Sequence, residues 1–169
     1  MIKRITEYLL SAAVAAMMAQ ACVSKIDPVF DDSSANRAEA LAEKLNETLV
    51  CCPNGWLLEY YPSSGQYYGG FNVLMSFSEG NKVKVGSEVA GPGKTATSTY
   101  TIYQSAGCVL SLDTYNDVMH YFADPETSGG EGAGYGFEGD FEFNVLELHD
   151  DKITLKGRKS GSRMTMTPM

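Results

Sequence analysis

The sequence has few of the residues that catalytic and metal sites usually require. Its 169 residues include two histidines and four cysteines, and no two cysteines have the CxxC spacing that is typical of zinc sites. No serine lies in the Gly-x-Ser-x-Gly pattern of a hydrolase nucleophile elbow. We therefore expect a protein without a metal or another cofactor, and we favour a non-catalytic role.

Basic residues are also scarce. The chain holds 13 lysines and arginines against 21 aspartates and glutamates, so its formal net charge is -8. A surface of this sign repels phosphate groups and anionic lipid headgroups. We therefore expect no nucleic-acid partner.

Long hydrophobic runs are absent except near the amino terminus. There, Lys3 and Arg4 precede an apolar stretch from Tyr8 to Ala19. This stretch is shorter than the roughly 20 residues that a membrane-spanning helix needs. A cationic start, a short apolar stretch and then small residues are typical of a signal peptide. We expect residues 1–21 to be removed on export.

The residues before Cys22 indicate how the exported chain is held. The segment Ala19-Gln20-Ala21-Cys22 resembles a lipobox, in which the cysteine is lipidated and the signal peptide is cut before it. We predict lipidation at Cys22, a tether over residues 22–33, and a membrane anchor in the cell envelope. The expected location is the outer membrane, on its periplasmic face or at the cell surface. The alternative is an ordinary signal-peptide cleavage site with Cys22 as a bystander.

The remaining chain is long enough for one domain. Removing residues 1–21 from 169 leaves 148, which can bury a substantial core. We expect a single β-rich domain over residues 34–169. Its cysteines leave two alternatives open. Cys108 pairs with Cys51 or Cys52 in an oxidising envelope, or these cysteines stay free as small buried residues.

One helix is predicted from about Ser34 to Val50, where apolar residues recur at three- and four-residue spacing. Charged residues fall on the opposite side, so one face should pack on a sheet that contains Trp56 and Phe77. Residues 53–55 then end the helix. The apolar stripe consists of Ala38, Leu41, Ala42, Leu45 and Leu49.

After residue 55 the hydrophobic period changes to two, which is typical of strands. Trp56–Tyr60 and Phe71–Ser78 alternate in this way, and residues 79–81 join the latter to Lys82–Val85 as a hairpin. The alternation slips within residues 141–148, which indicates a bulge or a strand buried on both faces. Further strands are predicted at residues 99–103, 109–112, 141–148, 152–157 and 163–167.

Many short strands joined by short turns favour an antiparallel meander. We therefore predict a mainly β (α+β) fold, in which the meander forms a sandwich or partial barrel with the amino-terminal helix packed on it. Gly91–Thr95 looks like the tail of a phosphate-binding loop, but β-branched residues follow it, so we interpret it as a loop between strands. The glycine-rich residues 129–139 are either a solvated loop or a cation or ligand loop.

Asp113, Asp117 and His120 form the grouping closest to a catalytic site. If residues 114–122 form a short helix, Asp117 and His120 share one face of it. The simpler interpretation is a capping box, in which Thr114 and Asp117 begin that helix. An envelope hydrolase that uses Asp113, Asp117 and His120 is therefore the alternative function.

Aromatic residues offer the better functional lead. Tyr61, Tyr67 and Tyr68 lie around a glycine-containing turn, and exposed rings stack on sugars or dock on proteins. We predict these three as ligand-binding residues. The alternative is that Tyr60 and Phe71 belong to the core, while Tyr67 and Tyr68 lie on the surface of a hairpin and bind no ligand.

Several short sequence motifs, taken in their order along the chain, resemble those of the Bacteroidetes lipoproteins catalogued as domain of unknown function 4302. Together they cover most of the chain from about residue 27. Members of that family are longer, so the chain is similar to their amino-terminal part. The motifs are NGWLLEYYP at residues 54–62, LDTYN at 112–116, HYFADP at 120–125, GDFEF at 139–143 and ITLKG at 153–157.

The resemblance implies an envelope lipoprotein, of a kind often found with outer-membrane uptake systems for nutrients such as starch. It implies no established activity and supplies no catalytic residues. We therefore expect a non-catalytic binding or accessory module that serves nutrient capture with such a system. Its expected partners are the membrane, through the lipid anchor, and a glycan, a peptide or a protein of the uptake complex.

Overall fold

The computed structural model describes residues 33–126 and 134–169, and residues 34–169 form one compact unit. The predicted signal peptide over residues 1–21 and the predicted lipidation site Cys22 lie outside the described residues, as does nearly all of the predicted tether. Within the described ranges, no helix combines the length and the apolarity needed to cross a membrane.

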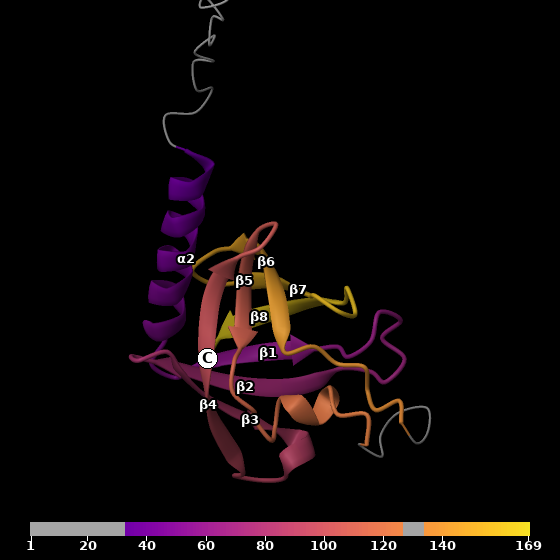
Figure 1. Cartoon of the computed structure of the whole chain (residues 1–169). Coiled ribbons are helices and arrows are strands. Elements are labelled where there is room, and N and C mark those ends of the chain that lie inside the picture. Colours follow the sequence, from indigo (N-terminus) through magenta and orange to yellow (C-terminus); the bar gives the residue numbers. More distant parts are fainter. Residues whose placement is uncertain (1–32, 127–133) are drawn as a thin grey trace, which may run out of the picture. The chain divides into compact units, whose positions relative to one another are not determined.

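Helix α2 (Ser34–Val50) comes first and is followed by strands (Figure 1). Two short 3-10 helices interrupt them: η1 (Glu88–Ala90) lies between β3 and β4, and η2 (His120–Phe122) lies between β5 and β6. The strands are β1 (Trp56–Tyr60), β2 (Phe71–Ser78), β3 (Lys82–Ser87), β4 (Thr95–Gln104), β5 (Cys108–Leu112), β6 (Glu142–Leu148), β7 (Ile153–Gly157) and β8 (Arg163–Pro168).

The strands form a closed antiparallel barrel in which each strand pairs with the next along the chain. Closure comes from β1 and β8, which pair antiparallel with Trp56 opposite Pro168 and Leu58 opposite Met166. The predicted mainly β fold, an antiparallel meander with an amino-terminal helix, is confirmed. The ladder runs all the way round, so the architecture is a full barrel, more specific than the predicted sandwich or partial barrel.

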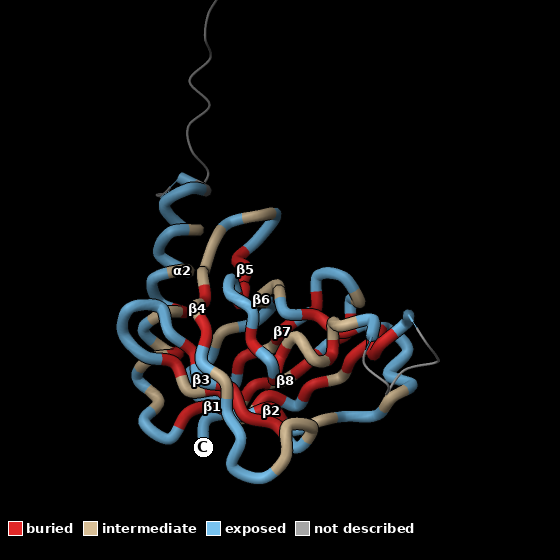
Figure 2. The backbone as a smooth tube through the Cα atoms, turned by 60° about the horizontal axis from the view of Figure 1, so that its bottom comes forward, coloured by how far each residue is buried: buried red, intermediate tan, exposed pale blue. Residues whose placement is uncertain are grey.

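Alternating side chains divide the barrel into a core face and a solvent face. In β1, Trp56, Leu58 and Tyr60 are buried, whereas Glu59 between them is exposed. The same alternation appears along β2, β7 and β8 (Figure 2), whereas all five residues of β5 are buried. The alternation is the period-two pattern expected of strands with one buried face. In β6 the register shifts at the predicted slip, between Val145 and Glu147, which confirms the bulge.

Helix α2 closes one end of the barrel. Leu45 and Leu49 are fully buried, and the indole Nε1 of Trp56 donates to the carbonyl of Leu49 at 3.0 Å. The prediction that Leu41 packs with them is wrong, because its side chain is 38% exposed. Ala42, which also belongs to the predicted stripe, does contact the core.

The opposite end of the barrel is filled with aromatic rings. Phe122 of η2 lies 4.7 Å from Tyr60 and 5.0 Å from Phe71, measured between ring centroids. Phe137, from the segment before β6, lies 5.6 Å from Phe71 and 5.8 Å from Phe122. In Figure 1, β1 runs from the side of α2 towards these loops.

Three cysteines lie in the described residues, and all are free thiols. Cys51 is exposed, Cys52 is half-buried and Cys108 is buried. Cys52 Sγ donates to the carbonyl of Gly55 at 3.0 Å. Of the two alternatives left open by the sequence, the structure therefore has the free thiols and no disulfide among these three, although only Cys108 is buried like a core residue.

Candidate functional site

Exposed aromatic side chains gather at the end of the barrel opposite α2. Tyr67 belongs to the loop between β1 and β2, whereas Tyr115, Tyr135 and Phe141 belong to the long connection between β5 and β6. Tyr67 is 79% exposed and Tyr115 is 65% exposed. Within the described residues, no large aromatic side chain is exposed to this degree at the end that α2 closes. This asymmetry makes the aromatic loops the candidate functional site.

Three of the rings at this site form a stack, Tyr115–His120–Phe141. The centroids of Tyr115 and His120 are 4.9 Å apart, and those of His120 and Phe141 are 4.5 Å apart with an interplanar angle of 24°. Offset stacking at such distances is favourable for aromatic rings. The outer two rings are exposed, so the stack presents fixed aromatic surface to solvent.

Asn116 holds the turn that carries this stack. It is buried, and its Oδ1 accepts the backbone N–H groups of Val118 and Met119, each at 3.1 Å. Its Nδ2 donates to Ser98 Oγ at 3.1 Å, which fastens the turn to β4. The side chain caps the turn over residues 117–119, which precedes η2, in the way that an N-cap residue caps a helix.

The predicted capping box of Thr114 and Asp117 is therefore wrong. Thr114 Oγ1 accepts the backbone N–H of Thr99 at 2.9 Å instead, so it is bonded to β4 and not to the turn. The helical turn begins two residues later than predicted, and within residues 114–122 only η2 (His120–Phe122) is a regular 3-10 helix. Asn and Thr are both good caps, so local sequence did not distinguish them.

His120 is bonded as a structural residue. Its Nδ1 accepts the backbone N–H of Asn116 at 3.1 Å, which assigns the proton of the neutral ring to Nε2. Partial burial lowers the pKa of His120 below its ordinary value of 6.5. The ring is therefore neutral at pH 7, as stacking between two aromatic rings favours.

Asp113, Asp117 and His120 have separate contacts in the described structure. Asp113 Oδ2 accepts a hydrogen bond from Thr101 Oγ1, and Asp117 is exposed. None of the hydrogen bonds and ion pairs among the described residues joins His120 to either carboxylate. The same residues contain no group of three or more His, Cys, Asp or Glu side chains that could hold a metal.

The three predicted ligand-binding tyrosines are in different surroundings. Tyr68 packs edge-on against Phe137, with centroids 5.3 Å apart. Tyr61 lies against Gly70, since a Cβ added to Gly70 would come within 2.7 Å of its ring. Tyr67 alone of the three is largely exposed. Of the three predicted tyrosines, Tyr67 is therefore the one whose ring is mostly accessible to solvent.

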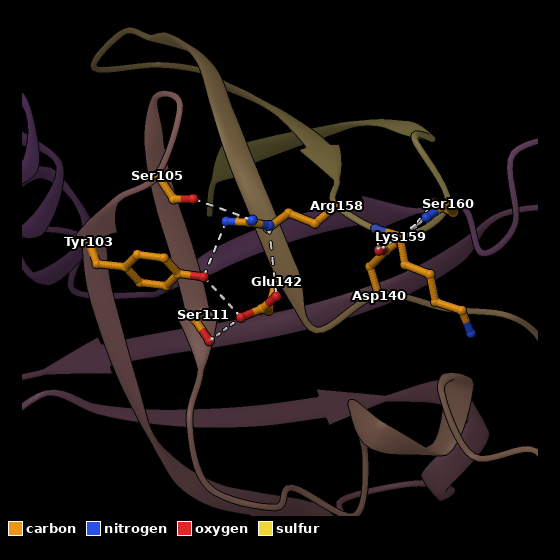
Figure 3. Close-up of polar contacts among 8 residues, drawn as sticks. All are labelled: Tyr103, Ser105, Ser111, Asp140, Glu142, Arg158, Lys159 and Ser160. Carbon is orange, nitrogen blue, oxygen red and sulfur yellow. Dashed lines mark hydrogen bonds and ion pairs between the residues drawn. The ribbon is translucent and has the colours of Figure 1, made fainter.

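Polar contacts fix the turn between β7 and β8 at this end (Figure 3). Arg158 Nε lies 3.8 Å from Glu142 Oε2, and Arg158 Nη1 donates to the Tyr103 hydroxyl at 3.2 Å. The Tyr103 hydroxyl in turn donates to Glu142 Oε1 at 3.0 Å. These groups bind one another across β4, β6 and the turn, so we interpret them as structural.

Asp140 makes the second set of contacts in Figure 3. Its Oδ1 accepts the backbone N–H groups of Lys159 at 2.5 Å and Ser160 at 3.2 Å, and its Oδ2 accepts from Ser160 Oγ. Gly157 must be glycine for this, because a Cβ there would collide with the carboxylate of Asp140.

The backbone of Asp140 is also bonded, to Tyr60 in the core. The Tyr60 hydroxyl donates to the carbonyl of Asp140 at 2.9 Å and accepts its N–H at 2.7 Å. Burial is the main cause of the raised pKa of Tyr60, so the hydroxyl keeps its proton and both bonds at all ordinary pH values. Asp140 thus positions Phe141, the next residue, in the aromatic stack.

Sequence reasoning missed Tyr115, Asn116 and Phe141 as site residues. Tyr115 and Phe141 are 26 positions apart, so no local period could join them. These residues lie in two of the motifs that carry the family resemblance, at residues 112–116 and 139–143, and that position is the sequence signal that points to them.

The fold and the site define an eight-stranded antiparallel barrel, closed at one end by a helix and bearing aromatic loops at the other. The chain belongs to the family described as Domain of unknown function (DUF4302), whose model matches residues 26–169. No curated protein and no solved structure matches the chain.

Proposed function

We propose that the chain is a cell-envelope lipoprotein, anchored through Cys22, whose barrel is a non-catalytic binding module. In this proposal the exposed rings of the aromatic loops hold the ligand, and the protein serves nutrient capture with an outer-membrane uptake system. The observation that carries the binding role is the Tyr115–His120–Phe141 stack, whose outer rings face solvent.

The stack suits a flat, neutral ligand such as a sugar ring. Tyr115 is backed by His120, so its ring is fixed before a ligand arrives and loses little conformational freedom on binding. The carboxylates of Asp113 and Asp117 on the same segment can accept hydroxyl hydrogens. An acidic chain with a formal charge of -8 disfavours anionic ligands. A neutral glycan is therefore the proposed ligand class.

A screen of neutral glycans tests the binding role. We expect the purified protein to bind at least one of them and Tyr115→Ala to weaken that binding about tenfold or more, as loss of a central aromatic contact does. Leu146→Ala is the control, because Leu146 is an exposed apolar residue of β6 outside the aromatic loops. Equal loss in both variants would reject the site.

The same assay separates binding from hydrolysis. Turnover of a glycan or peptide that disappears in Asp117→Ala or His120→Ala would replace the proposal with an envelope hydrolase. Binding of peptides alone, lost in Tyr115→Ala, would keep the site and change the ligand class.

The anchor is tested independently of the ligand. We expect the protein expressed with residues 1–33 to partition with membranes and to carry the added mass of lipid on Cys22. Cys22→Ser should lose both properties. A Cys22→Ser variant that keeps the wild-type mass and membrane partition would show that Cys22 is not the anchor.

A further inference from the structure

A glycine interrupts the solvent face of the barrel where nothing in the fold requires one. Gly86 lies within β3, between Leu74 of β2 and Thr95 of β4 in the strand register. A Cβ at Gly86 would meet Thr95 Cγ2 at 3.4 Å and the carbonyl of Lys94 at 3.7 Å, which are ordinary contacts. Glycine weakens a strand interior and often marks a place where a ligand approaches.

The missing side chain leaves room for two adjoining hollows. One has a volume of about 480 Å³ and the other of about 330 Å³. Both are lined by Leu74, Gly86 and Thr95. Leu74 is 45% exposed, and Gly86 is buried at the floor. The larger hollow is within the size range of small-ligand sites and has an apolar floor.

Two opposite charges border this larger hollow, on the loop between β3 and β4. Glu88 Oε1 accepts the backbone N–H of Asn72 at 3.0 Å, so one oxygen is fixed and Oε2 is left for another donor. Lys94 lines the same hollow beyond the turn Gly91–Gly93. Among the described residues, neither Glu88 nor Lys94 takes part in an ion pair. The loop therefore presents one anion and one cation that do not neutralise each other.

From this arrangement we infer that the hollow is a binding site for a small zwitterion, a free amino acid with an apolar side chain. The apolar side chain lies over Leu74 and Gly86, the α-ammonium group meets the Glu88 carboxylate, and the α-carboxylate meets the Lys94 ammonium group. Charge-assisted hydrogen bonds of this kind are stronger than neutral ones. This site is separate from the aromatic stack and does not depend on the proposed glycan binding.

Calorimetric titration of the full chain tests the inference with three probes that share one branched apolar group. L-leucine carries both charges, 4-methylpentanoate lacks the ammonium group, and 3-methylbutylamine lacks the carboxylate. We expect L-leucine to bind about tenfold more tightly than either of the others, since each lost charge-assisted contact costs roughly one factor of ten. Equal affinity for all three, or no heat with L-leucine, would overturn the inference.

Variants assign the contacts. Glu88→Gln should remove the advantage of L-leucine over 4-methylpentanoate, and Lys94→Gln should remove its advantage over 3-methylbutylamine. Gly86→Val should fill the floor and abolish binding, while its branched side chain suits a strand. Thr97→Val is the matched control, because Thr97 lies on β4 but lines neither hollow.

Binding of L-leucine that persists in Gly86→Val would place the ligand elsewhere and contradict the site. Tyr115→Ala should leave L-leucine binding unchanged, because Tyr115 lines neither hollow. A loss of glycan binding in that variant therefore tests the proposed function alone. A loss of L-leucine binding in it would contradict the second site.

Discussion

The two ends of the barrel are closed by different kinds of structure. At one end, a single regular helix supplies Leu45 and Leu49, and its hydrogen bond from Trp56 joins residues seven positions apart. At the other end, rings from separate segments meet, and the bonds between Tyr60 and Asp140 join residues 80 positions apart. The first end is closed by one helix, whereas the second is closed by a set of loops.

This difference is the reason why the proposed binding role is assigned to the loop end. Loops on a rigid scaffold can vary in sequence without loss of the fold, and they carry function more often than regular elements do. Here the loop end also exposes Tyr67, Tyr115, Tyr135 and Phe141. Its buried rings pack the loops together, and stacking on His120 holds the exposed rings of Tyr115 and Phe141.

The largest effect is expected from Phe122→Ala, which removes the ring at the centre of the loop end. Phe122 is fully buried and contacts Tyr60, Phe71 and Phe137. Its loss should lower the free energy of unfolding by about 3 to 5 kcal/mol, measured by urea denaturation. A change near zero would mean that the loop end is not packed as described.

Leu45→Ala tests the helix end in the same way. Leu45 is fully buried, whereas Leu41, one turn earlier, is 38% exposed. We expect Leu45→Ala to cost about 2 to 5 kcal/mol of unfolding free energy and Leu41→Ala to cost less than about 1 kcal/mol. Equal effects of the two substitutions would show that the helix faces the barrel differently.

Tyr60→Phe isolates the hydrogen bonds that tie the loop end to the core. It removes only the hydroxyl and so leaves the N–H and carbonyl of Asp140 buried without this partner. The expected cost is about 1 to 3 kcal/mol of unfolding free energy. Tyr61→Phe is the neighbouring control and should change little. A Tyr60→Phe variant as stable as the wild type would show that the two hydrogen bonds between Tyr60 and Asp140 do not stabilise the fold.

A smaller, pH-dependent effect is expected from His120. Its pKa is lowered below 6.5 in the folded protein, so the unfolded chain takes up this proton first as the pH falls. The stabilisation is present above the unfolded pKa and is lost as the pH falls through the folded pKa. The melting temperature of the wild type minus that of His120→Gln should therefore shrink between about pH 7 and about pH 5.

Calorimetry of both proteins over that range measures the difference. Carboxylates titrate in both proteins, so their contribution largely cancels. A difference in melting temperature that stays constant or widens towards acid pH would contradict the neutral, stacked histidine.

Sequence alone predicted the elements of the helix end because their information is local. Leu45 and Leu49 follow a helical period, β1 and β2 alternate, and the slip within residues 141–148 marked the bulge of β6. Leu41 was misplaced because Leu41 and Ala42 are neighbours on the helix. Both fit the predicted stripe, but only Ala42 contacts the core, and periodicity does not resolve where the stripe ends.

The closure of the barrel and the loop end could not be predicted in this way. Barrel closure depends on pairing Trp56 with Pro168, and the aromatic stack on bringing Phe141 to His120. Asp140 looked like one acidic residue beside a glycine-rich loop, but it is buried and bonded on both its side chain and its backbone. Such contacts depend on the whole fold. In the sequence, only the motifs that carry the family resemblance pointed to these residues.

The most direct test of binding at the loop end is to map the contact of a bound glycan by NMR. Amide shifts should change on titration within residues 113–122 and 134–141, while those of α2 and residues 51–55 stay unchanged and the ligand resonances show no product. Shifts confined to the helix end, or new ligand resonances from cleavage, would contradict the claim that the aromatic loops bind without chemistry.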